Sequence, residues 1–290
     1  MMLEYRKKNI DIISCKYNRH NINDNIILEA LGSFNNQHNL AIELANVVYD
    51  NYLKNILNFE YLTTNNDIFK VKFIIDDTSM LNRFNASIIA LNNIEKSITI
   101  KIYLSSQIKK QDSRYIINQL ISSITHELMH GHVFLKRLNN NVEILDEPIY
   151  YPNIISVIQT VNPDTILYKF SYALYATYYQ EVNAIVSQTN TQLYNILGYG
   201  YNHNNEIIKN AIKNTEPYII YNMILNEVVP CIENMTDPLI ENLIIEPLKQ
   251  FNINLTINDI KKKTKYIKLI SEKALYNILR NAMLQTHNIN

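Results

Sequence analysis

The chain has 290 residues, of which 47% are hydrophobic and 19% charged. This composition is sufficient for a large buried core and excludes a disordered, highly charged segment. Lysine plus arginine and aspartate plus glutamate both total 27, so the formal net charge is zero. Because a neutral chain offers no overall field to phosphates or anionic lipids, we expect neither a nucleic acid nor a membrane as partner.

The start of the chain lacks the features of an export signal. Glu4, Arg6, Lys7, Lys8 and Asp11 interrupt its apolar residues, so no hydrophobic signal core forms there, and no later run of about 18 apolar residues predicts a membrane span. Two cysteines in the whole chain do not make a disulfide framework. We therefore expect a cytoplasmic protein. Its scarce glycine (4) and missing tryptophan are typical of an AT-rich genome, as in some bacteria, phages and large viruses.

The first third of the chain mixes a helix with strands. Apolar residues recur at helical spacing over 39–58, then alternate with polar residues over 70–75 and again over 98–104. A short apolar run at 87–91 predicts a third strand. The polar residues 92–96 predict a hairpin between the last two strands, so at least part of the sheet is expected to be antiparallel.

From residue 112 onward the pattern is mostly helical. It predicts one helix over 113–136, a second long helix over 170–196 with a proline-containing loop before it, and three or four helices over 205–285. The predicted fold class is α+β, with a small antiparallel or mixed sheet followed by a mostly helical lobe. We expect a mixed lobe over 1–140 and a helical lobe over 141–290, joined in one compact catalytic unit.

Residues 126–130 read His-Glu-Leu-Met-His and lie inside the first of these helices. Residues four apart on a helix differ by about 40° in direction, so His126 and His130 can bind one metal ion. Glu127 lies beside them and is placed to act as a general base on a metal-bound water.

This motif, on a helix preceded by a strand, resembles the active-site helix of the zincin metallopeptidases over about residues 97–136. The resemblance implies a Zn²⁺ cofactor held by His126 and His130, with Glu127 as the catalytic base. It also implies an edge strand along the substrate cleft, for which the strand at 97–104 is the candidate.

The sequence departs from two zincin patterns. The metzincin extension requires glycine at Val133 and histidine at Lys136, so that branch is excluded. His132 stands two positions after the second histidine, where members of the superfamily usually carry a hydrophobic residue.

A catalytic zinc site needs a third protein ligand. The candidates are His132, Glu143, Asp146, Glu147, Glu181 and His203. His132 lies about 200° around the helix from His130 and faces the wrong way. Glu181 is favoured because its apolar and aromatic neighbours in the middle of the predicted helix disfavour a solvated carboxylate, although a half-buried helix charge is the alternative. Glu181, with the small residue Ala184 three positions later, is also similar to the glutamate helix of the gluzincin branch.

Peptide hydrolysis also needs a group that stabilises the developing oxyanion. Tyr201 and His203 are the candidates, because Gly198 and Gly200 allow their loop to approach a ligand closely.

The sequence thus predicts a zinc-dependent metallopeptidase of gluzincin type, acting on a protein or peptide substrate through a metal-activated water. One alternative is a non-catalytic protein that keeps a zincin scaffold, such as a phage virion or host-interaction component. Another is an intracellular toxin or effector protease. No pattern in the sequence indicates an oligomeric state.

Overall fold

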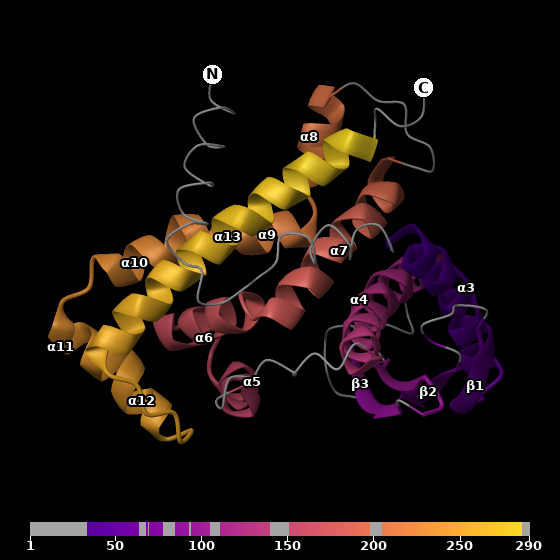
Figure 1. Ribbon diagram of the computed structural model, residues 1–290, viewed down its shortest axis with the longest axis horizontal. Helices are drawn as coiled ribbons and strands as arrows, with labels where there is room; N and C mark the ends of the chain where they lie inside the picture. Colours follow the sequence, from indigo (N-terminus) through magenta and orange to yellow (C-terminus); the bar gives the residue numbers. More distant parts are fainter. Residues whose placement is uncertain are drawn as a thin grey trace.

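A computed structural model describes residues 34–63, 68, 70–77, 85–92, 94–104, 111–139, 151–197 and 205–285 (Figure 1). The architecture is α+β, as the sequence predicts. The mixed part contains α3 (Phe34–Leu53), β1 (Asn58–Leu62), β2 (Lys70–Asp76), β3 (Asn85–Asn92), β4 (Ser97–Tyr103) and α4 (Ser113–Asn139).

The remaining described elements are helical. They are α5 (Tyr151–Thr160), α6 (Ile166–Ala176), α7 (Tyr179–Leu197), α8 (Asn205–Lys213), α9 (Glu216–Met223), the π-helix η2 (Ile224–Val228), α10 (Val229–Glu233), α11 (Asp237–Ile240), the π-helix η3 (Glu241–Ile245), α12 (Glu246–Lys249) and α13 (Ile257–Gln285).

The four described strands form one mixed sheet in the order β1-β2-β4-β3. β1 pairs antiparallel with β2, β2 pairs parallel with β4, and β4 pairs antiparallel with β3. The β3–β4 pairing confirms the predicted hairpin. The expectation that 97–104 is an edge strand is wrong, because β4 lies between β2 and β3. In the described sheet β3 is the edge strand next to β4, and the register of its pairing with β4 shifts between Ile88 and Ala90.

α3 and α4 pack with the sheet around one apolar core. Along β2 the buried side chains Val71, Phe73 and Ile75 alternate with half-buried ones, as expected for a sheet with one face on the core. The predicted helix 39–58 ends earlier, at Leu53. Asn55 has a φ of 57°, a left-handed conformation that ends the helix, and a short extended segment then leads into β1.

Gly131 lies where α4 meets the sheet. A Cβ atom at this position would lie 3.0 Å from Cγ2 of Ile98 and 3.5 Å from Cδ1 of Ile68. We expect Gly131→Val to lower the free energy of unfolding by about 1–3 kcal/mol, because its extra methyl groups overpack this contact. Urea denaturation measures the change, and Gly131→Ala should cost less. A valine variant as stable as the parent would contradict this account.

The second part of the chain has its own apolar core, in which Phe170 and Tyr221 are the largest fully buried side chains. The predicted single helix over 170–196 is wrong, because the chain forms α6 and α7 with a break at Thr177 and Tyr178. Thr177 Oγ1 donates a hydrogen bond to the carbonyl of Ala173 at 2.7 Å, which satisfies an acceptor at the end of α6. The expected loop before it also contains a helix, α5.

The described residues 205–285 form four continuous helical segments, in agreement with the predicted three or four. Two of them pass through a π-helical turn close to an internal proline, Pro230 after η2 and Pro247 after η3. Proline removes a backbone donor and crowds the preceding turn, which accounts for the wider turn there. No helix within the described ranges is both long enough and apolar enough to cross a membrane.

Candidate metal centre

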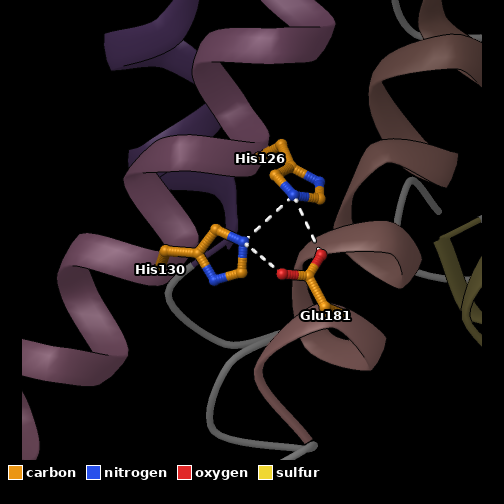
Figure 2. Close-up of side chains that lie close together, drawn as sticks. All are labelled: His126, His130 and Glu181. Atoms are coloured by element: carbon orange, nitrogen blue, oxygen red, sulfur yellow. Dashed lines mark hydrogen bonds and ion pairs between the residues drawn. The ribbon is translucent and has the colours of Figure 1, made fainter. Parts of the chain in front are cut away.

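α4 presents its two motif histidines to α7, beside which it lies in Figure 1. Ile124 and Leu128 of the same helix are fully buried in the core that α4 shares with the sheet. This packing fixes the rotation of α4 and leaves the histidine face toward α7. The Nε2 atoms of His126 and His130 lie 3.0 Å apart, and the two side chains are 15% and 17% exposed (Figure 2).

α7 contributes Glu181, which is only 2% exposed. Its Oε2 lies 3.5 Å from Nε2 of His126, and its Oε1 lies 3.5 Å from Nε2 of His130. The predicted mid-helix position of Glu181 is wrong, because the break after α6 puts it in the first turn of α7. A carboxylate there is stabilised by the positive end of the helix dipole, which helps to offset the cost of burial.

The three side chains fit a tetrahedral metal ion. Their ligand atoms all lie within 4.8 Å of one another. Zinc bonds of about 2.0–2.2 Å at tetrahedral angles would separate ligand atoms by about 3.3–3.6 Å. The distances of 3.0, 3.5 and 3.5 Å are close to that range. Two imidazoles and one carboxylate are a donor set that zinc accepts, and they leave a fourth position open.

The electrostatics of the site also favour a cation. Burial lowers the pKa of His130 to about 4, so its imidazole is neutral near pH 7 and available as a ligand. Burial opposes the charged form of His126, but the hydrogen bond to Glu181 and the charges of Glu127 and Glu181 outweigh it and raise the pKa of His126. The same two carboxylates would stabilise a metal ion at this place.

Glu127 points to the edge strand. The residue is 7% exposed, and its Oε2 accepts a hydrogen bond from the backbone N–H of Ile88 in β3 at 2.9 Å. Burial raises the pKa of Glu127 to about 7, while the charge of His126 and the N–H of Ile88 act in the opposite direction. A carboxyl group with a pKa near neutral can both accept and return a proton.

Of the other predicted site residues, only His132 lies within the described ranges. His132 is buried but does not belong to the one three-residue group among the described residues that could hold a metal ion. Glu143, Asp146, Glu147, Tyr201 and His203 lie outside the described residues. The oxyanion-stabilising role of Tyr201 and His203 therefore stays a prediction.

A line of buried and half-buried polar contacts lies between α4 and α7 beside the candidate metal centre. We call it the polar seam, and beyond Glu181 it comprises Gln188 and Thr191 of α7, Ser122 and Thr125 of α4, and His38 of α3. Gln188 Nε2 donates to Oγ of Ser122 at 3.5 Å, and Nδ1 of His38 lies 3.1 Å from Oγ1 of Thr191. No sequence pattern predicted the polar seam, although Gln188 and Thr191 follow Glu181 by seven and ten residues, a spacing that puts them near one face of a helix.

His38 should make the stability of the protein depend on pH. Burial lowers its pKa from 6.5 to about 4. As the pH falls, the unfolded chain protonates His38 before the folded chain does. The contribution of neutral His38 to the free energy of unfolding is therefore complete above pH 6.5 and is lost as the pH falls toward 4. Between pH 7 and pH 5 we expect the parent to lose about 1–2 kcal/mol more unfolding free energy than His38→Leu does. Parallel urea titrations measure this difference, and equal losses would contradict a buried neutral His38.

Neither a family model, nor a curated protein, nor a solved structure matches the chain. Any assignment of function therefore rests on the chemistry of the site itself.

Proposed function

We propose that the protein is a zinc-dependent metallopeptidase of gluzincin type. The observation that carries this proposal is the convergence of His126, His130 and Glu181, from two helices, on a point where their ligand atoms lie within 4.8 Å of one another. Three protein ligands with an open position are the arrangement of catalytic zinc, whereas structural zinc usually takes four.

In the proposed reaction, bound zinc would lower the pKa of a water molecule and polarise the scissile carbonyl. His126 and His130 would hold the ion with neutral imidazoles, and Glu181 would supply negative charge that partly neutralises it. Glu127 accepts the proton of the attacking water and returns it to the leaving amine. The N–H of Ile88 holds one oxygen of Glu127 and leaves the other oxygen for the proton.

The position of β3 favours an extended peptide as substrate. In the described sheet β3 has β4 on one side and no strand on the other, and Ile89 and Ala90 are exposed. An exposed strand edge can pair with an extended peptide through its backbone groups. Because Ile88 contacts Glu127, a peptide aligned along this edge would pass the catalytic base.

Chelation tests this function. We expect the full chain to hydrolyse an unfolded, fluorescently labelled protein, to lose this activity when the metal is removed by a chelator, and to regain it when zinc is returned. Hydrolysis that persists in chelator would contradict a metal mechanism. Zinc binding without hydrolysis of any unfolded protein or peptide would contradict the peptidase function and favour the non-catalytic scaffold. A non-catalytic scaffold has no evident use for an intact Glu127.

A further inference from the structure

The second ring nitrogen of His126 is buried on the side away from the metal centre. Figure 2 shows this atom, Nδ1, pointing toward α7 at a level beyond Glu181. No described group meets hydrogen-bond geometry with it. A neutral imidazole that offers Nε2 to a metal carries its proton on Nδ1, so this buried N–H requires an acceptor nearby.

Gln188 is the polar side chain that α7 brings to this place. It follows Glu181 by seven residues, so the two side chains leave the helix within about 20° of the same direction. Its Nε2 lies 3.5 Å from Oγ of Ser122, which is one turn before His126 on α4.

The two ends of the Gln188 amide can serve different neighbours. With its nitrogen turned to Ser122, its oxygen is the end that remains for the imidazole of His126. Rotation about the three side-chain bonds of the half-buried Gln188 can bring this oxygen to Nδ1 of His126 without moving either helix.

We infer, on the basis of the proposed function, that Gln188 is a positioning residue of the metal centre: its amide oxygen accepts the hydrogen bond from Nδ1–H of His126 and so keeps Nε2 unprotonated and directed at the metal. Ser122 holds the other end of the amide. One helix, α7, then supplies both the third ligand and the group that orients the first ligand.

The test is the zinc affinity of the full chain, measured by competition with a chromophoric chelator. We expect Gln188→Leu, which removes the acceptor and keeps the volume, to weaken zinc binding by about 10–100-fold. Gln188→Glu retains an acceptor and should bind zinc as tightly as the parent or more tightly. Gln192→Leu is the matched control, because Gln192 lies on the same helix but accepts from the N–H of Glu216; it should change the affinity less than about twofold.

A second measurement keeps the inference testable if Gln188→Leu does not fold. In the zinc-loaded parent, Nδ1–H of His126 should give a slowly exchanging proton resonance, and its absence would overturn the inference. Equal zinc affinities for Gln188→Leu and Gln192→Leu would also overturn it and leave the metal centre intact. A parent chain that binds no zinc would instead overturn the proposed function.

Discussion

Glu127→Gln is expected to abolish peptide hydrolysis while zinc stays bound. The amide has the size of the carboxylate, and its oxygen can still accept the hydrogen bond from the N–H of Ile88, so the local structure should persist. An amide cannot accept the proton of the attacking water. We therefore expect kcat/KM to fall by at least about 100-fold, as is typical when a general base is lost.

Glu95→Gln is the matched control for this substitution, because Glu95 is an exposed carboxylate in the turn between β3 and β4. It should retain the activity of the parent. Zinc content is measured on the same samples. A Glu127→Gln protein with undiminished hydrolysis would refute the proposed mechanism, and one that has lost its zinc would show that Glu127 acts as a ligand.

Glu181→Ala should weaken zinc binding more than any change outside the three ligands. It leaves two histidines and removes the buried negative charge that lies 3.5 Å from each of them. Loss of a hydrogen-bonding neighbour of a ligand typically costs 10–100-fold in affinity, so loss of the ligand should cost more than about 100-fold. Competition with a chromophoric chelator measures the zinc affinity of the parent and of the Glu181→Ala protein.

Glu216→Ala controls for the loss of a helix-terminal carboxylate. Like Glu181, Glu216 lies in the first turn of its helix, but it is exposed. Its removal should leave zinc affinity unchanged, because a solvated carboxylate far from the site does not neutralise the ion. Equal affinities for the Glu181→Ala and Glu216→Ala proteins would remove Glu181 from the site and with it the gluzincin assignment.

Short-range patterns predicted much of what positions the site. The spacing of His126 and His130 placed both on one face of a helix, and period-two alternation located β2 and β4. The apolar neighbours of Glu181 correctly indicated that its carboxylate is buried. These features depend on the local pattern of side chains, which a single sequence displays directly.

Features that side-chain periodicity and turn motifs do not encode were missed or misplaced. The break at Thr177 follows from local capping within a stretch that is helical by periodicity, so Glu181 was placed in the wrong part of its helix. The edge position of β3 depends on the parallel pairing of β2 with β4, which no turn motif in the sequence predicts. The contact from Ile88 to Glu127 uses a backbone N–H, and any residue type at position 88 except proline would provide it.

The most direct test of the account is the metal content of the purified full chain, measured by elemental analysis beside the His126→Ala/His130→Ala double variant. The two imidazole Nε2 atoms lie 3.0 Å apart and face a buried carboxylate, an arrangement that a dication would stabilise. The account predicts about one zinc per parent chain and none in the double variant. A parent without zinc, or a double variant with the same zinc content as the parent, would contradict it.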